Sequence, residues 1–224
     1  MYEFSLRYVV LGEKNSGKSW FIKRFSRDAY RSCRGTDTHK LLIDAGKHSL
    51  QIEIADTSGD ILQRTDVAQY VSHRTCAILV FDISCRKSFD KLSYWCQFAK
   101  EHSTSSYMRF IVVGIGHGKD RVVYKNEVQN WMNAFLGIKK GAYYEIYEYT
   151  PFLTIQSVFV NSAKEVCNDV LLNYYTDSLY AAGITRYDRF SRDQNIHVIV
   201  SPVVTRKQSA IIESSACFKV CVIL

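Results

Sequence analysis

The fold is decided by one short stretch near the N-terminus, Gly12-Glu13-Lys14-Asn15-Ser16-Gly17-Lys18-Ser19. It follows an apolar run, residues 4–11 (FSLRYVVL), that is typical of a strand, and it precedes a helical pattern from Ser19 to about Arg27. In the spacing GxxxxGK(S/T), glycines let the backbone curl until its N–H groups point inward at an anion. The following helix presents its positive N-terminal end to the same charge. The sequence therefore predicts a loop that holds phosphate groups.

Side chains of this loop have distinct expected roles. Lys18 is expected to reach the β- and γ-phosphates of a nucleotide, and the Ser19 hydroxyl to bind Mg²⁺. The other candidate nucleotide-binding residues of this region are Gly12, Lys14, Asn15, Ser16, Gly17 and Trp20. A simple glycine turn is the alternative, and the strand before the loop and the helix after it disfavour that interpretation.

Apolar, strand-like runs alternate with helical patterns along the rest of the chain. Further strands are predicted over residues 41–43, 50–54, 77–83, 110–113 and 157–160, and helices over residues 88–100, 127–136 and 163–182. Residues 44–47 join the first two of these strands as a hairpin turn. Buried strands separated by helices predict an α/β fold, a doubly wound and mostly parallel sheet with helices on both faces. Ligands of such sheets bind beyond the carboxyl ends of the strands.

The predicted domain covers residues 1–183, and residues 184–224 are interpreted as a tail. A tyrosine-rich stretch, residues 138–156 (IKKGAYYEIYEYTPFLTIQ), lies between a predicted helix and a predicted strand and is interpreted as an insertion. Within the tail, residues 197–204 (HVIVSPVV) are unusually apolar. We expect this segment to dock on the domain or on a partner.

Composition narrows the partners only loosely. The formal net charge of +7 favours anionic partners such as nucleotide phosphates or acidic lipid, although a solvated basic surface is equally consistent with it. We expect no nucleic-acid partner. The seven cysteines show no zinc-type CxxC pair, and the first five are interpreted as reduced thiols. No signal peptide or membrane-spanning run is present, so any membrane contact is expected to come from a lipid or an accessory surface.

Several motifs, in the right order, resemble the Ras superfamily of small GTPases and its Rab branch in particular. Besides the phosphate loop, Asp56-Thr57-Ser58-Gly59 is similar to the DTAG motif of the family, and Ser162-Ala163-Lys164 to its SAK motif. The resemblance covers about residues 5–137 and 157–183. It implies a small G-domain that binds GTP or GDP with Mg²⁺, acts as a molecular switch, and meets effector proteins through its switch loops and an exchange factor.

The same resemblance implies roles for further residues. Asp56 would lie near Mg²⁺, acting mainly through water, and the Gly59 N–H would meet the γ-phosphate. Tyr30 would pack against the guanine edge, and Ser162-Ala163-Lys164 would flank the base. The alternatives are a strand-end cap for Asp56, core packing for Tyr30 and an ordinary helix N-terminus for the trio.

Two departures from the family concern hydrolysis. The glutamine that orients the attacking water in the family is replaced by Asp60, which is shorter and anionic and is the candidate at the catalytic position. Lys14 stands where the family has glycine or another small residue. This lysine would crowd the path of a partner's arginine finger or would contribute its own charge. Together the two changes predict slow or absent GTP hydrolysis.

Two further departures concern Mg²⁺ and the base. The count to the family's Mg²⁺-binding threonine lands on Asp37, between Thr36 and Thr38, so either threonine is a candidate ligand, or neither is. The guanine-reading NKxD motif is missing as such. With a two-residue shift, only Asp120 remains to accept the N1 and N2 protons of guanine; without a gap, a glycine stands in the aspartate's place and guanine selectivity is weak or absent.

The chain ends in Cys221-Val222-Ile223-Leu224, a C-a-a-X pattern whose final leucine favours geranylgeranylation of Cys221. One lipid anchors only reversibly, and palmitoylated Cys217 or the modest basic excess of the tail is a candidate second signal. We therefore expect a lipid-anchored protein on the cytoplasmic face of a membrane, with a prenyl-binding escort.

Two functions remain open on these grounds. The first is a membrane-anchored molecular switch in vesicle trafficking or signalling, with impaired hydrolysis. The second is a non-hydrolysing, GTPase-like interaction module that keeps the nucleotide as a structural cofactor or has lost it. A small-molecule kinase is disfavoured, because the chain lacks a second substrate domain.

Overall fold

A computed structural model describes residues 2–25, 37–44, 49–57, 64–105, 107–136, 141–167, 169, 183–188 and 197–198. In this part of the chain, strands form one sheet in the order β6-β5-β4-β1-β3-β2-β8, with β7 paired to β1 off this path. The strands are β1 (Tyr2–Leu11), β2 (Asp37–Asp44), β3 (Ser49–Asp56), β4 (Cys76–Asp82), β5 (Arg109–Gly116), β6 (Gly141–Tyr147), β7 (Ile184–Asp188) and β8 (His197–Val198). The helices are α1 (Lys18–Phe25), α2 (Arg64–Val71), α3 (Arg86–Asp90), α4 (Leu92–His102), α5 (Lys125–Phe135) and α6 (Phe152–Cys167).

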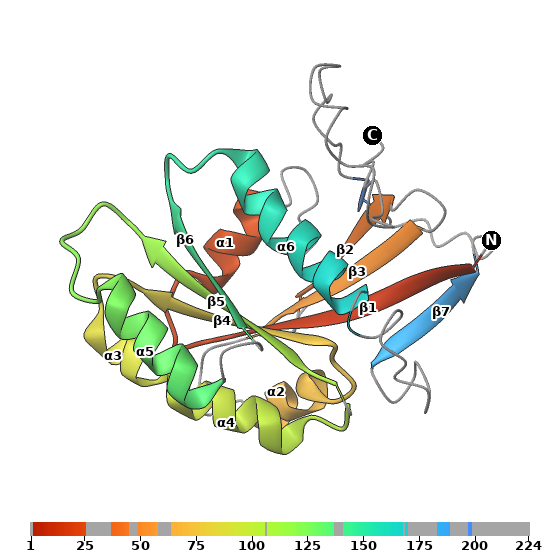
Figure 1. Ribbon diagram of the computed structural model, residues 1–224, viewed down its shortest axis with the longest axis horizontal. Helices are drawn as coiled ribbons and strands as arrows, with labels where there is room; N and C mark the ends of the chain where they lie inside the picture. Colours follow the sequence, from red (N-terminus) through yellow and green to blue (C-terminus); the bar gives the residue numbers. More distant parts are fainter. Residues whose placement is uncertain are drawn as a thin grey trace.

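The predicted doubly wound α/β fold is confirmed. β1 pairs in parallel with β3 and β4, β4 with β5, and β5 with β6, while β2 and β3 form an antiparallel hairpin. Helices α1 and α6 cover one face of the sheet and α2 to α5 the other (Figure 1). Every residue of β4 is buried, because a parallel strand at the centre of such a sheet is covered on both sides.

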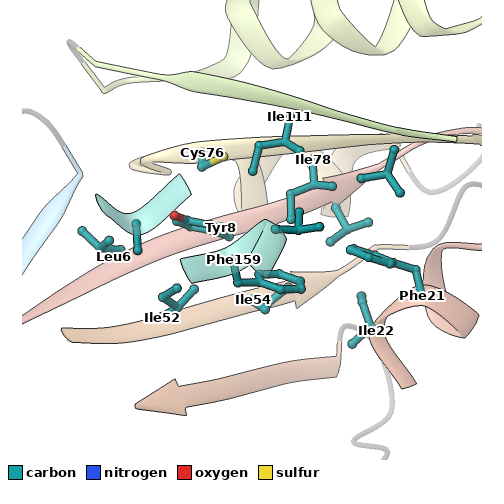
Figure 2. Close-up of a cluster of buried hydrophobic side chains, with 14 of the residues drawn as sticks. Leu6, Tyr8, Phe21, Ile22, Ile52, Ile54, Cys76, Ile78, Ile111 and Phe159 are labelled. Atoms are coloured by element: carbon teal, nitrogen blue, oxygen red, sulfur yellow. The ribbon is translucent and has the colours of Figure 1, made fainter. Parts of the chain in front are cut away.

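The core between the sheet and helices α1 and α6 contains an aromatic stack. Phe21 of α1 lies against Phe159 of α6, with ring centroids 5.5 Å apart (Figure 2). Beneath them, the hydroxyl of Tyr8 on β1 is hydrogen-bonded to the hydroxyl of Ser162, 2.9 Å away. A buried tyrosine requires such a polar partner, so the pair fixes α6 against the middle of β1.

The segment after α5 differs from its prediction. Residues 138–156, interpreted as an insertion, contain β6, a regular strand of the sheet, and the first turn of α6. The strand predicted over residues 157–160 is wrong, because these residues lie inside α6, which begins at Phe152 rather than near Ala163. Proline at position 151 directly precedes the helix, where its missing N–H has no intrahelical partner to lose.

Part of the predicted tail belongs to the sheet. β7 pairs antiparallel with residues 2–6 of β1, and β8 pairs in parallel with Leu41 and Leu42 of β2. Figure 1 shows β7 running along the N-terminal half of β1. The expectation that the apolar stretch 197–204 docks on the domain is confirmed for its first two residues. Within the described ranges, no helix combines the length and apolar character needed to cross a bilayer.

An ion pair joins β6 to the loop after β5. Both carboxylate oxygens of Glu145 accept hydrogen bonds from Arg121, at 3.0 and 2.7 Å, and the hydroxyls of Tyr143 and Tyr147 donate to the same carboxylate at 2.7 Å. Burial acts to raise the pKa of Glu145, but these hydrogen bonds and the charge of Arg121 outweigh it and lower the pKa from 4.5 to about 2. The ionised carboxylate therefore holds the loop in place.

We expect Phe159→Ala to lower the free energy of unfolding by about 3–5 kcal/mol, because it removes a fully buried ring and leaves a cavity. Leu153→Ala, in the same helix but at a side chain that is 48% exposed, is the matched control and should change the stability by less than about 0.5 kcal/mol. Urea unfolding measures both values. Equal effects of the two substitutions would contradict the packing described for α6.

We expect Glu145→Gln to destabilise the protein in a pH-dependent way. Because the pKa of Glu145 is lower in the folded state, its stabilising contribution is present above its ordinary value of 4.5 and is lost as the pH falls toward 2. The difference in unfolding free energy between wild type and variant should shrink over that window. Glu148→Gln, at an exposed position of the following loop, serves as control and should show no such trend. A difference independent of pH would exclude the ion pair as its source.

Candidate nucleotide-binding site

The glycine-bearing loop lies between β1, which ends at Leu11, and α1, which begins at Lys18, as the sequence predicts. Its backbone bends through left-handed conformations, with φ of 153° at Gly12 and 94° at Gly17. A Cβ at Gly12 would clash with the carbonyl oxygen of Val80 on β4. Asn15 also has positive φ, at 62°, which asparagine tolerates better than most residues. The loop path thus requires these residue types.

Lys18 projects into the loop that precedes it. Its ammonium group donates hydrogen bonds to the carbonyl oxygens of Gly12, at 3.0 Å, and Glu13, at 2.8 Å. Only 6% of the residue is exposed. Burial lowers the pKa of Lys18 from 10.5 to about 8, and the nearby charges of Asp56 and Glu13 partly oppose this shift. A poorly hydrated cation of this kind gains much from an anion placed beside it.

The neighbouring loop residues take positions consistent with the predicted roles. Ser19 is exposed in the first turn of α1, with its hydroxyl available for Mg²⁺, whereas Ser16 is buried under the loop. Lys14 is exposed on the outer side. The phosphate part of a nucleotide therefore fits the chemistry of this loop, because a buried cation and the start of helix α1 both lie at it.

Asp56 ends β3 beside this loop. It lies in register with Val10 of β1 and with Asp37 of β2. The next residue, Thr57, is buried and donates a hydrogen bond of 2.5 Å to the carbonyl oxygen of Val10, which ties the end of β3 to β1. Asp56 is thereby close enough to influence the pKa of Lys18. Ser19 and Asp56 offer the oxygen ligands that Mg²⁺ prefers.

Of the two threonines that are candidate Mg²⁺ ligands, the structure describes one. Thr38 lies exposed in β2, paired with Ala55 of β3. Other candidate residues from the sequence fall outside the described residues: Tyr30, Thr36, Gly59, Asp60, Cys217 and Cys221.

The trio Ser162-Ala163-Lys164 does not lie at the end of a strand, so its resemblance to a base-flanking loop is not supported by its position. All three residues lie in the interior of α6. Ser162 and Ala163 are buried, and the Ser162 hydroxyl contacts Tyr8, four residues before the phosphate loop. At roughly 3.3 Å per strand residue, that contact is about 13 Å from the loop. The trio stabilises the core instead.

The loop that follows β6, the strand paired in parallel with β5, was missed by sequence reasoning. It is the turn Tyr147–Thr150, closed by a hydrogen bond from the Thr150 N–H to the Tyr147 carbonyl, at 3.0 Å. One guanidinium nitrogen of Arg24 on α1 donates to the carbonyl oxygens of Glu148 and Thr150, both at 2.9 Å. Thr150-Pro151 ahead of an apolar helical pattern was the signal that could have located this turn.

The base-reading positions after β5 are also unlike the family pattern. Ile115 is fully buried in the sheet, and Gly116 is followed by His117 in the loop. Asp120 is exposed in this loop, and within the described part of the chain no hydrogen bond or ion pair orients its carboxylate. The phosphate end of the predicted site is thus assembled, and the predicted base end is not.

A comparison with protein families agrees with the fold and the phosphate loop. The family model described as "Ras family" matches residues 7–172, well over half of the chain. The match includes the second half of β1 with its glycine loop, and the β6–α6 region. Ras-family proteins are small GTP-binding proteins and in general bind GTP or GDP with Mg²⁺, effectors and exchange factors. This chain therefore belongs to the Ras family of small GTP-binding proteins.

Proposed function

We propose that this chain is a Rab-like, membrane-anchored molecular switch in vesicle trafficking or signalling, whose intrinsic GTP hydrolysis is slow. One observation carries the nucleotide-binding part of the proposal: the buried ammonium of Lys18 lies within the glycine loop, close enough to Asp56 for the two charges to interact. These groups supply a cation for the phosphates and oxygen ligands for Mg²⁺. When bound, Mg²⁺ would neutralise charge on the β- and γ-phosphates.

Slow hydrolysis follows from the residues near the γ-phosphate. Lys14 is exposed on the phosphate loop, where a partner's arginine finger would approach. Asp60 replaces the water-orienting glutamine, and its carboxylate would repel the phosphate oxygens rather than orient a water toward them. Effector proteins and an exchange factor would meet the switch loops, as in the family.

Anchoring follows from the last four residues. Geranylgeranylated Cys221 would place the protein on the cytoplasmic face of a membrane, and a prenyl-binding escort would carry it between membranes. Cys217 would supply a second, palmitoyl anchor, because a single lipid chain holds a protein only reversibly.

A second candidate function is a non-hydrolysing interaction module. The observation that favours it is the ring of Tyr147, which lies over Gly116 so closely that any side chain there would clash. In the alignment without a gap, Gly116 takes the place of the lysine of the family's base-reading motif, and a lysine side chain has no room there. Such a module would hold nucleotide as a structural cofactor and present a fixed surface.

The nucleotide content and turnover of the purified full-length protein test the proposal. We expect copurified nucleotide, slow loss of the γ-phosphate in single turnover, and no bound nucleotide in Lys18→Ala.

We further expect Asp60→Gln alone to raise the hydrolysis rate little. The double variant Asp60→Gln with Lys14→Gly should hydrolyse GTP about tenfold faster or more than Asp60→Gln alone. A large gain from Asp60→Gln alone would show that Lys14 does not impede hydrolysis. A folded wild type without nucleotide would favour the interaction module.

We expect Cys221→Ser to move the protein from the membrane pellet to the supernatant when cells that carry out prenylation are fractionated. Cys217→Ser is the matched variant, and it should lose only part of the membrane-bound fraction because the prenyl chain remains. Undiminished membrane association of Cys221→Ser would rule out the prenyl anchor.

A further inference from the structure

The loop after β5 and helix α1 form one surface beside the phosphate loop. A Cβ at Gly17 would lie 3.2 Å from the Nε2 of His117 and 3.1 Å from the side chain of Ile115. The ring of His117 meets the indole of Trp20 edge-to-face, with centroids 5.1 Å apart. Helix α1 and the loop after β5 thus share an aromatic contact beside the glycine loop.

The turn after β6 joins this surface through Arg24. The guanidinium of Arg24 lies 5.8 Å from the Trp20 ring and holds the carbonyl oxygens of the turn. In the same turn Tyr147 and Tyr149 are stacked at 5.2 Å with an interplanar angle of 11°. Tyr149 is 82% exposed, although an aromatic ring is costly to leave in water. We refer to Trp20 and His117 as the aromatic cluster; Tyr147 packs against the core on the other face of the sheet from Trp20.

In the part of the chain that the structure describes, the carboxylates that could read the edge of guanine are not held ready for it. A base is discriminated when a fixed carboxylate or amide would be left unpaired by the wrong base. The carboxylate of Glu145 is already bound by Arg121 and two tyrosines. Those of Glu148 and Asp120 are exposed, and no contact within the described residues orients either of them.

From this arrangement we infer that the base is held by stacking on the aromatic cluster, chiefly on Trp20, without readout of its edge. The chain then binds nucleoside triphosphates with little discrimination between guanine and adenine. Stacking is tolerant of base identity, because every base presents a π-face, and the edge of the base remains hydrated in either case. The inference deepens the proposed function and rests on its phosphate site.

Calorimetric titration of the nucleotide-free, full-length protein with Mg²⁺ and GTP, ATP or inorganic tripolyphosphate tests the inference. We expect the Kd values for GTP and ATP to agree within about threefold, and both to be about tenfold or more below that of tripolyphosphate, as one stacked base provides. Trp20→Ala should weaken GTP and ATP equally, by about tenfold, and leave tripolyphosphate unchanged. Trp20→Phe keeps a ring and should retain the affinity for both nucleotides within about threefold.

Phe135→Ala removes a ring from the opposite face of the sheet and is the matched control, so it should leave all three affinities unchanged. A preference of about thirtyfold or more for GTP over ATP overturns the inference, because edge readout would then operate. Nucleotides that bind no more tightly than tripolyphosphate overturn it as well, since the base would make no contact. If the folded wild type binds none of the three, the phosphate site itself fails, and the inference falls with the proposed function.

Discussion

A cation with little water around it organises one end of this molecule. The ammonium of Lys18 lies under the glycine loop and is hydrogen-bonded to two backbone carbonyl oxygens. That position exists only because β1 ends where it does, α1 starts one loop later, and Gly12 packs directly against the backbone of β4. The parallel pairing of β1 with β3 then brings Asp56 to the same place. An anion bound there relieves the cost of burying the charge.

Short sequence patterns predicted the parts of the fold whose structure depends on neighbouring residues in the chain. The glycine spacing located the β1–α1 connection, and apolar runs located β4 and β5, because strands buried on both faces must be apolar throughout. β6 lies at the end of the sheet, and most of its residues are only half-buried. It therefore carries tyrosines rather than an apolar run and was taken for an insertion. Ser162-Ala163-Lys164 resembles a base-flanking loop motif but lies inside α6. Three residues are too few to specify a position in a fold.

The candidate site divides in the same way. Its phosphate end is built from consecutive residues, so a sequence motif describes it almost completely. The base end that we propose combines Trp20 and His117, joined by their ring contact, with the turn after β6, which Arg24 holds by hydrogen bonds and which lies against Gly116 through Tyr147. These parts lie far apart along the chain. No spacing rule connects these residues. The family match over residues 7–172 accounts for the scaffold that carries these side chains.

The antiparallel ladder between β7 and β1 has a consequence for how the chain tolerates shortening. β4 pairs with β1 only from Tyr8 onward, so the first half of β1 projects beyond its neighbour, and β7 fills that vacancy. The Thr75 hydroxyl secures the start of β7 by donating to the carbonyl oxygen of Gly183. Truncation before that glycine would bare a row of backbone amides on an exposed edge strand, ready to pair with a second molecule. β7 thus covers backbone groups of β1 that would otherwise lie at an exposed edge of the sheet.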